Sequence, residues 1–373
     1  MSKINSFSKN ELIRYSRHFN IPEFGLEAQE KLKKSSVLVV GAGGLGSPVL
    51  LYLAAAGVGR IGIVEFDVVD ESNLQRQVLY TTEDVGKSKA QLAKKRLMAL
   101  NPFIKIILHE TKLTSENALE IISQYDVVAD GTDNFPTRYL VNDACVLAGK
   151  VNIFASIFRF EGQVAVFNFL QEDGKLSANY RDMFPTPPPP GMVPNCAEGG
   201  VLGVLPGIIG SMQASEVIKV LTGIGEPLVN RFFMFDAASF TMRTLKIRRN
   251  EEISISQLID YEDFCGMTQN NEIDKIKTIT ILELKEWMAE KVDFQLIDVR
   301  EEFEHEIFNI GGELIPSGEI LENAERINRA KKVVIYCRSG ARSATAIAQL
   351  QELGSFDNLY NLEGGMLAWE AES

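Results

Sequence analysis

A glycine-rich turn between two apolar runs contains the first residues of the chain that could bind a phosphate. Residues Val37 to Val40 are typical of a β-strand, a helix-like segment follows the turn, and a second apolar run extends from Ile61 to Val64. The glycines of the turn are Gly41, Gly43, Gly44 and Gly46. Glycines let the backbone approach a phosphate closely, and the N-terminus of the following helix offers free N–H groups. The spacing therefore predicts a strand–turn–helix–strand unit that binds the phosphates of a nucleotide.

The residues after the second apolar run indicate which nucleotide is bound. Glu65 lies about 20 residues beyond the turn, where a carboxylate can accept a hydrogen bond from a ribose hydroxyl, and by itself this indicates NAD or FAD. A dehydrogenase, however, does not need the polar and cationic side chains that follow, whereas a triphosphate needs fixed positive charge. We therefore interpret the unit as an ATP site. Its further predicted residues are Asp67, Ser72, Asn73, Leu74, Gln75, Arg76 and Lys89.

Asp133 and Asn134 follow another predicted strand, Asp126 to Ala129. Carboxylates at the carboxyl ends of parallel strands lie at the ligand-binding crevice of an open α/β sheet. The alternative is that the two residues only cap the next helix.

Two of the four cysteines lie where a thiol could react. Cys337 begins a loop between an apolar strand, Val333 to Tyr336, and a helix from Ala344 to Leu353. Backbone N–H groups, the helix dipole and two arginines would stabilise a thiolate or persulfide there. The residues of this loop are Arg338, Ser339, Gly340, Ala341 and Arg342. Cys196 lies on a loop framed by Pro and Gly, which predicts an accessible thiol.

The composition limits the class of protein. The chain has 373 residues, 45% of them hydrophobic, so two or three domains are expected. A net charge of −12 argues against broad binding to nucleic acid or a membrane surface. We find no apolar run of about 18 residues and no signal-peptide core near the N-terminus. Four widely spaced cysteines indicate a reducing compartment, and we expect a cytoplasmic protein.

Strands alternate with helices along residues 1–265, which predicts a doubly wound, mostly parallel sheet of Rossmann-like α/β type. Residues 266–277 are polar and are interpreted as a linker. Residues 278–373 have the pattern of a second, smaller α/β domain.

Both halves resemble known families. The first 265 residues resemble the ubiquitin-activating-like adenylyltransferases, the activators of molybdopterin-synthase and thiamine sulfur carriers, through ordered motifs that cover the whole half. These are Arg14–Arg17, Gly41–Gly46, Glu65–Asp67, Ser72–Gln77, Lys89, Thr132–Asn134, Cys196–Gly200 and Gly207–Glu216. Residues 278–373 resemble a single rhodanese domain, through Asp298–Arg300, Cys337–Ser343 and Leu362–Gly365. The pair resembles the fused activators known from molybdenum cofactor synthesis and eukaryotic tRNA thiolation.

The resemblance implies the chemistry. ATP would adenylate the C-terminal glycine carboxylate of a small ubiquitin-like sulfur carrier that ends in Gly-Gly, and a persulfide on Cys337 would convert it into a thiocarboxylate. A cysteine desulfurase or thiosulfate would supply the sulfur. The implied roles are phosphate support by Gly44, ribose binding by Glu65, phosphate contacts by Asn73, Arg76 and Lys89, Mg²⁺ binding or action at the reacting centre by Asp133, and capture of the activated carrier by Cys196. Arg17 would reach the partner protomer's site, which implies a homodimer.

Two departures from the family pattern are visible. The ribose residue of the family is mostly Asp, whereas Glu65 is one methylene longer. The family's zinc site uses two Cys-x-x-Cys pairs, but the place of the first reads Asn179-Tyr180-Arg181-Asp182, and the chain has no such pair anywhere. We therefore predict no zinc, and we expect hydrophobic packing to hold this region instead.

Two alternatives remain at this stage. The glycines and Glu65 also permit an NAD- or FAD-dependent oxidoreductase fused to a thiosulfate sulfurtransferase, although Arg76, Lys89 and Asp133 do not suit it. A scaffold without catalysis is disfavoured by the intact Lys89, Arg76 and Cys337.

Overall fold

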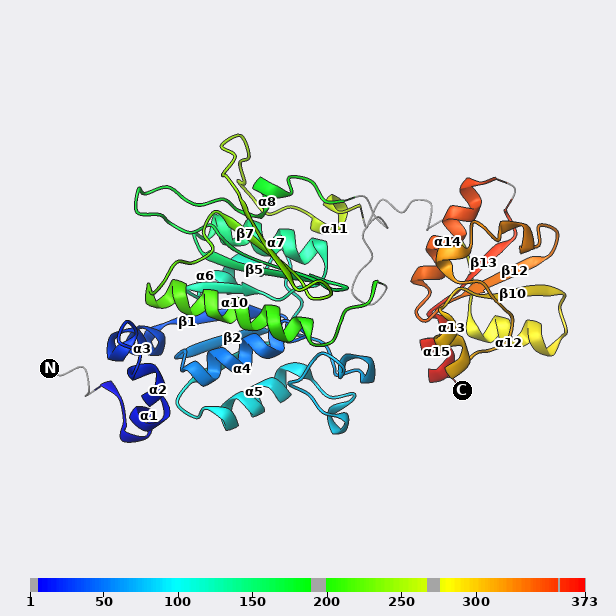
Figure 1. Cartoon of the computed structure of the whole chain (residues 1–373). Coiled ribbons are helices and arrows are strands. Elements are labelled where there is room, and N and C mark those ends of the chain that lie inside the picture. Colours follow the sequence, from blue (N-terminus) through cyan, green and yellow to red (C-terminus); the bar gives the residue numbers. More distant parts are fainter. Residues whose placement is uncertain (1–5, 189–198, 267–275, 355, 373) are drawn as a thin grey trace. The chain divides into compact units, whose positions relative to one another are not determined.

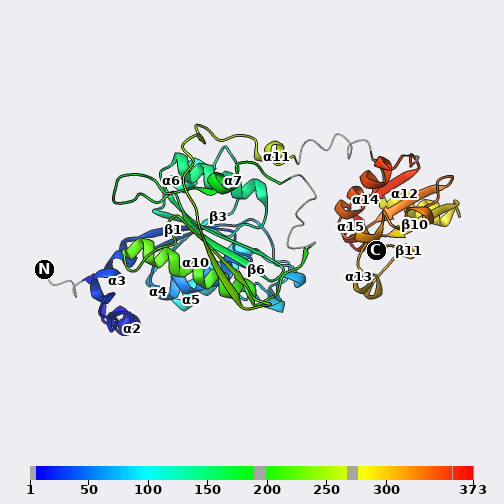
Figure 2. The ribbon, with the colours of Figure 1, turned by 45° about the horizontal axis from the view of Figure 1, so that its top comes forward.

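The computed structural model describes residues 6–188, 199–266, 276–354 and 356–372. The chain divides into two compact units, Met1–Cys265 and Gly266–Ser373. Figures 1 and 2 show both units, which are described separately below. Within the described residues, every helix is too short or too polar to cross a lipid bilayer.

Unit 1 is built on an eight-stranded sheet with the order β3-β2-β1-β4-β5-β6-β7-β8. Strands β1 to β5 run parallel to their neighbours, and β5 to β8 are antiparallel. This confirms the predicted mostly parallel α/β sheet. The strands are β1 (Ser36–Val40), β2 (Arg60–Val64), β3 (Lys105–His109), β4 (Val127–Asp130), β5 (Val151–Phe158), β6 (Glu161–Phe167), β7 (Arg231–Asp236) and β8 (Thr241–Lys246).

Helices cover both faces of this sheet because its parallel strands are apolar on both sides. Along β1, Val37 and Val39 pack into one core cluster, whereas Leu38 and Val40 pack into the other. Helices α3 (Gly25–Lys34), α4 (Gly46–Ala56), α5 (Lys89–Leu100) and α10 (Leu205–Thr222) contribute to the first cluster, and α6 (Ala118–Ser123) and α7 (Phe135–Leu147) to the second (Figures 1 and 2).

The N-terminal segment forms α1 (Lys9–Arg14) and α2 (Ser16–Phe19) before α3. A capping box starts α1: Glu11 N–H donates to Ser8 Oγ at 3.2 Å, and Ser8 N–H donates to Glu11 Oε2 at 2.8 Å. The ring of Tyr15 packs on Gly57, at the C-terminal end of α4. These helices therefore lie near the amino ends of the parallel strands, away from the glycine turn.

Two elements end or begin at a residue with positive φ, and for one of them the predicted boundary was wrong. Strand β6 ends at Phe167, because Asn168 adopts a φ of 56° and turns its amide to the carbonyl oxygens of Cys145 and Lys150. The helix predicted from Ala344 begins earlier, at Ala341, after Gly340 with a φ of 90°.

A buried ion pair holds the region of Asn179–Asp182, where we expected hydrophobic packing instead of the zinc that the resemblance implies. Arg181, in α8 (Tyr180–Met183), donates to both carboxylate oxygens of Asp143 at 2.7–3.0 Å, and Asp143 is only 1% exposed. Tyr261, in α11 (Tyr261–Phe264), donates to the same carboxylate at 2.8 Å. The rings of Tyr139 and Tyr180 pack beside this cluster. The expectation of hydrophobic packing was therefore incomplete, since charge pairing contributes as well.

Unit 2 is a five-stranded parallel sheet with the order β11-β10-β12-β13-β9. Its strands are β9 (Lys277–Ile279), β10 (Phe294–Asp298), β11 (Glu313–Leu314), β12 (Lys332–Tyr336) and β13 (Leu359–Leu362). Its helices are α12 (Ile281–Ala289), α13 (Glu302–Ile307), α14 (Ala341–Glu352) and α15 (Gly365–Ala371). Strand β9 begins inside the segment predicted as a linker, of which residues 267–275 lie outside the described residues.

Candidate active sites

The glycine turn connects β1 to α4 at the carboxyl ends of the parallel strands. Gly41 adopts a φ of 88°, a left-handed conformation that favours glycine. A Cβ on Gly46 would lie 2.0 Å from the carbonyl oxygen of Gly41, so no side chain fits there. The turn is therefore tight, and it leads directly into the N-terminus of α4, where anions are favoured.

Glu65 and Tyr80 fix the peptide groups on either side of Ala42 within this turn. Glu65 Oε2 accepts from the N–H of Ala42 at 2.9 Å, and its Oε1 accepts from the N–H groups of Phe66 and Asp67, both at 2.9 Å. The hydroxyl of Tyr80 donates to the carbonyl oxygen of Ala42 at 2.9 Å. Glu65 and Tyr80 are both buried. We call this arrangement the Ala42 clamp, and it holds the turn before any ligand binds.

Burial raises the pKa of the Tyr80 phenol, and the nearby Glu65 carboxylate raises it further. The hydroxyl therefore keeps its proton and remains a hydrogen-bond donor to the clamp at any ordinary pH.

Arg76 lies over the glycine turn. A Cβ on Gly44 would be 3.7 Å from Arg76 Cγ, and a Cβ on Gly43 would be 3.4 Å from the side-chain nitrogen of Gln77. Arg76 Nη1 donates to the carbonyl oxygen of Ser72 at 3.0 Å. The stem of Arg76 thus lies against the turn, and its guanidinium is held by the segment Glu71–Asn73 that precedes it.

Lys89 begins α5 and is buried beside Asp67. Its Nζ lies 3.3 Å from Asp67 Oδ2, and its N–H donates to the Asp67 carbonyl oxygen at 3.0 Å. The Asp67 side chain remains 55% exposed. Because the Tyr80 hydroxyl also lies 3.4 Å from the Lys89 carbonyl oxygen, the start of α5 is joined to the Ala42 clamp.

Asp133 is exposed on the loop between β4 and α7. A Cβ on Gly41 would lie 3.2 Å from the Gly131 carbonyl oxygen, so this loop packs on the glycine turn. Thr132, just before Asp133, donates through its N–H and hydroxyl to Asp130, and its carbonyl oxygen accepts from Arg138 at 3.3 Å. Burial raises the pKa of Asp130. Asn134 caps α7 by accepting from Thr137 N–H, as the alternative interpretation proposed.

Other predicted residues lie farther away or outside the described part. Ser72, Asn73, Leu74 and Gln75 belong to the segment that carries Arg76. Arg17 is exposed on α2, beyond the C-terminal end of α4. Since the 11 residues of α4 span about 16 Å, Arg17 is remote from the glycine turn of its own chain. Cys196 lies outside the described residues.

The Cys337 thiol forms a separate site in unit 2. It is 1% exposed, and its sulfur accepts from Gly340 N–H at 3.2 Å and from the Ser343 hydroxyl at 3.4 Å. The loop lies between β12 and the N-terminus of α14, as predicted. These donors, together with the helix dipole, stabilise negative charge on the sulfur.

Arg342 has a different arrangement from the one expected. Its guanidinium donates to both carboxylate oxygens of Glu304, in α13, at 2.7 and 2.8 Å. Its charge is therefore shared with a carboxylate rather than reserved for the thiolate. The Ser343 hydroxyl also lies 2.6 Å from Asn361 Oδ1, and because it carries one proton it donates either to that oxygen or to the sulfur.

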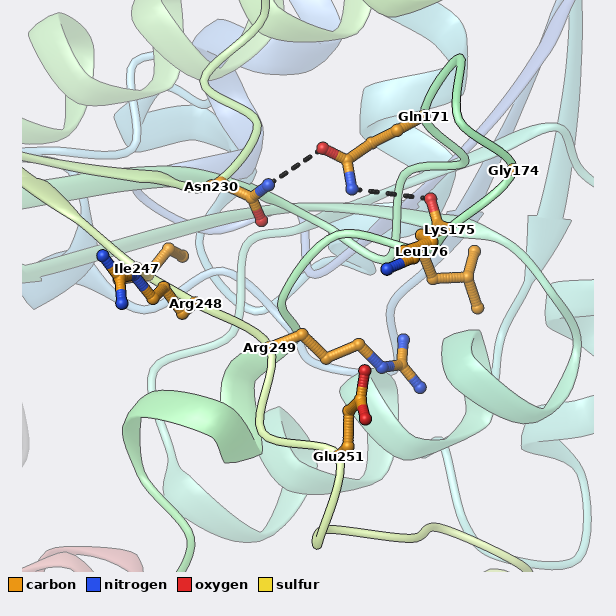
Figure 3. A pocket seen from close by; sticks show the side chains of 9 residues that line it. All are labelled: Gln171, Gly174, Lys175, Leu176, Asn230, Ile247, Arg248, Arg249 and Glu251. Carbon is orange, nitrogen blue, oxygen red and sulfur yellow. Dashed lines mark hydrogen bonds between the residues drawn. The ribbon is translucent and has the colours of Figure 1, made fainter.

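Sequence reasoning missed Tyr80, Glu304 and Asn361, because none of them belongs to a motif that indicates its contact. A cavity of about 520 Å³ was also not expected (Figure 3). It lies where β6 ends and β7 begins, near the amino ends of the parallel strands and away from the glycine turn, so it has no part in the chemistry above. Its lining residues are Gln171, Gly174, Lys175, Leu176, Asn230, Ile247, Arg248, Arg249 and Glu251.

Within the described residues, no group of three or more His, Cys, Asp and Glu side chains is arranged to hold a metal ion. The exposed carboxylates of Asp133 and Asp67 nevertheless offer the oxygen ligands that Mg²⁺ prefers, alongside substrate phosphates.

Comparison with known protein families gives two matches. Residues 15–255 match the ThiF family, and residues 280–372 match the rhodanese-like domain.

Relatives are similar over most of the chain. A probable adenylyltransferase/sulfurtransferase MoeZ of Mycobacterium tuberculosis is 50% identical over 370 residues, which cover 98% of this chain and 94% of that protein. A sulfur carrier protein adenylyltransferase of Thermus thermophilus is 56% identical over 268 residues, 70% of this chain and 99% of that protein. The adenylyltransferase and sulfurtransferase MOCS3 of Aedes aegypti is 41% identical over 390 residues, 98% of this chain and 88% of that protein.

Among solved structures, E. coli MccB in complex with MccA-N7isoASN is similar with a TM-score of 0.58 and 22% identity, over 67% of this chain and 75% of that chain. This likeness shows the shared fold.

Proposed function

The chain belongs to the ThiF family and carries a C-terminal rhodanese-like domain, and from this premise we propose that it adenylates a ubiquitin-like sulfur carrier and then transfers sulfur to it. The named relatives are adenylyltransferases and sulfurtransferases, which fits this function and not the oxidoreductase alternative. One observation carries the proposal: Arg76 lies over Gly44, in a turn whose backbone the Ala42 clamp already fixes.

In the first step, the C-terminal glycine carboxylate of the carrier attacks the α-phosphate of ATP, and pyrophosphate leaves. Both reactants are anions, so the reaction needs cations and N–H donors fixed in place. We assign phosphate contacts to Gly44, Asn73, Arg76 and Lys89. Glu65 Oε2 has one lone pair left beyond its bond to Ala42, and we assign it to a ribose hydroxyl.

Mg²⁺, held through the exposed carboxylate of Asp133, would supply charge neutralisation on the phosphates when bound. Asp67 is already paired with Lys89 and orients that lysine. Thr132 is held from both sides by Asp130 and Arg138, so the loop that carries Asp133 is preorganised.

In the second step, we assign capture of the activated carrier to Cys196: its thiolate attacks the acyl adenylate, a thioester forms and AMP leaves. The outer sulfur of a persulfide on Cys337 then attacks the thioester carbonyl, and the Cys196 thiolate leaves. A thiol finally attacks Cys337 Sγ, so the thiocarboxylate leaves and a disulfide remains on Cys337, which cellular thiols reduce. The sulfur carrier of molybdenum cofactor synthesis, or that of thiamine synthesis, is the proposed substrate.

We further propose a cytoplasmic homodimer. The support is the position of Arg17: it is too remote to serve its own glycine turn, whereas a partner protomer could receive it.

The test of adenylation is carrier-dependent exchange of labelled pyrophosphate into ATP. We expect exchange with at least one small protein ending in Gly-Gly from the same cell, and much weaker exchange after R76A. Absence of exchange with every such carrier, together with tight binding of NAD, would overturn the proposal.

A further inference from the structure

Helix α13 has its polar and apolar faces reversed. A surface helix ordinarily turns apolar residues inward and charged residues outward. In α13 and the residue after it, Phe303 is 62% exposed, Ile307 79% and Phe308 42%. Phe303 and Ile307 are four residues apart and therefore share one side of the helix.

The inward side of α13 is held by polar contacts. Glu304 accepts both hydrogen bonds from Arg342, and His305 Nδ1 lies 2.9 Å from Asp298 Oδ2. Arg300 donates to the Phe308 carbonyl oxygen at 2.7 Å. These three polar contacts fix the orientation of α13, and this orientation turns its apolar side chains toward solvent. Several large apolar side chains held exposed on one short, fixed segment indicate an interaction site.

The exposed surface is also acidic. Residues 301–306 contain four glutamates and neither lysine nor arginine. Of these, Glu301, Glu302 and Glu306 are exposed, whereas Glu304 faces Arg342. We call the surface of Phe303, Ile307, Phe308, Glu302 and Glu306 the α13 ridge. Its complement is a protein surface that is apolar in the middle and basic at its edge.

The α13 ridge lies next to the reactive thiol. Arg342, which Glu304 binds, is on the first turn of α14, and Gly340, two residues before it, donates to the Cys337 sulfur. A protein that docks on the ridge is therefore placed beside the Cys337 loop.

Building on the proposed function, we propose that the α13 ridge docks the protein that delivers sulfur to Cys337, a protein with a cysteine persulfide beside a basic and apolar surface. The carrier is activated at the glycine turn of unit 1 and so is bound there. The sulfur donor needs to meet only unit 2, and the ridge is a surface of unit 2 alone. The acidic edge selects a basic partner.

The delivery step is balanced without an oxidant. The Cys337 thiolate attacks the outer sulfur of the donor persulfide. The S–S bond of the donor breaks, a new bond forms to Cys337 Sγ, and the electron pair leaves on the donor thiolate. Thiosulfate can load the same thiol with release of sulfite, but it is too small to need the ridge.

The test compares the two donors on the full chain. We would measure the rate at which Cys337 is loaded by a cysteine desulfurase of the same cell, charged with radiolabelled cysteine, and by thiosulfate. The double variant F303S/I307S removes the exposed apolar side chains, and E302K/E306K reverses the edge charge. We expect each to slow loading by the desulfurase at least about tenfold, the size of a typical interface hot spot, while loading by thiosulfate stays within about twofold.

The matched control is L353S. Leu353 is 57% exposed and caps the far end of α14, about 18 Å along that helix from the Cys337 loop, so loading should not change. Pyrophosphate exchange, measured on the same variants, should also stay at its wild-type rate. Its absence in the wild type would count against the proposed function alone.

Three results would overturn the inference. Wild-type loading by thiosulfate but not by the desulfurase would exclude a protein donor. An equal loss with both donors would show that the variants disturb the Cys337 loop. Unchanged desulfurase loading, with slower transfer from preloaded Cys337 to the carrier, would assign the ridge to the carrier instead.

Discussion

The carboxylate of Glu65, at the end of β2, accepts a 2.9 Å hydrogen bond from the N–H of Ala42, in the turn after β1. The two residues are 23 positions apart, and the bond ties the second strand to the phosphate-binding turn. An aspartate would be shorter by about 1.5 Å, one carbon–carbon bond. The added methylene of Glu65 therefore lets one carboxylate hold the turn and still keep a lone pair for a ribose hydroxyl.

Shortening this side chain should weaken ATP binding. In E65D the carboxylate cannot reach both Ala42 N–H and the N–H groups that follow β2. Loss of a charged hydrogen bond costs about 1.5–3 kcal/mol, so we expect KM for ATP to rise about tenfold or more with a smaller change in kcat. Pyrophosphate exchange against ATP concentration measures this. The exposed Glu71 provides the matched control, E71D. An unchanged KM in E65D would show that the clamp has no role in binding.

Tyr80 holds the carbonyl group of Ala42, as Glu65 holds its N–H group. In Y80F the carbonyl oxygen of Ala42 loses its donor while the ring still fills the core. A buried acceptor without a partner costs about 1–3 kcal/mol. We expect a lower melting temperature of unit 1 and slower pyrophosphate exchange, with loading of Cys337 unaffected. Exchange at the wild-type rate in a destabilised Y80F would mean that the hydroxyl supports only the fold.

Many strands and both site loops could be predicted from short stretches of the sequence. The apolar runs predicted most ends of the parallel strands within one or two residues. This works because a parallel strand that is buried on both faces appears in the sequence as an uninterrupted apolar run. The glycine turn was recognisable since Gly41 and Gly46 are required there by φ and by space. The Cys337 loop was recognisable because a thiol followed by arginines and glycine precedes a helix.

The contacts that hold the sites depend on pairs far apart in the sequence. Arg342 was expected to serve the thiolate, but Glu304 lies 38 residues earlier and binds it. Arg181 and Asp143 are likewise 38 residues apart. Nothing in the spacing of these residues indicates which carboxylate each arginine meets, since this depends on how the strands between them are ordered.

The Arg181–Asp143 pair should carry the stability that zinc gives elsewhere in the family. Removing one partner of a buried ion pair costs about 3–5 kcal/mol because the other charge stays buried and uncompensated. We therefore expect D143N to lower the melting temperature of unit 1 strongly. Chelators such as EDTA should leave the wild type unchanged, as measured by calorimetry in a magnesium-free buffer. The exposed pair Lys112–Glu262 is the control, and E262Q should cost at most about 1 kcal/mol. A chelator-induced loss of stability would contradict this account.

Asp298 should make unit 2 sensitive to acid. Burial acts to raise the pKa of its carboxyl, but hydrogen bonds from Arg300 and His305 outweigh it and lower the pKa below 3.8. A carboxyl whose pKa is lower in the folded than in the unfolded state stabilises the fold at any pH above its unfolded-state pKa. This stabilisation is lost as the pH falls through its folded-state pKa. We expect the melting temperature of unit 2 to fall below about pH 4. In D298N this dependence should be weaker and the unit less stable at pH 7. Equal acid sensitivity in wild type and variant would refute this assignment.

Replacing Cys337 should separate the two activities. The sulfur of Cys337 is the group that we assign to carry persulfide, and its hydrogen-bond partners Gly340 and Ser343 both belong to unit 2. We expect C337A to abolish sulfur transfer from thiosulfate and thiocarboxylate formation on the carrier, while carrier-dependent pyrophosphate exchange keeps its rate. Cys265 offers the matched control: it is buried, and burial raises the pKa of its thiol to about 11, so the thiol is unreactive at neutral pH and C265A should retain sulfur transfer. Loss of adenylation in C337A would show that the thiol serves the first step as well, and the division of labour between the units would then be wrong.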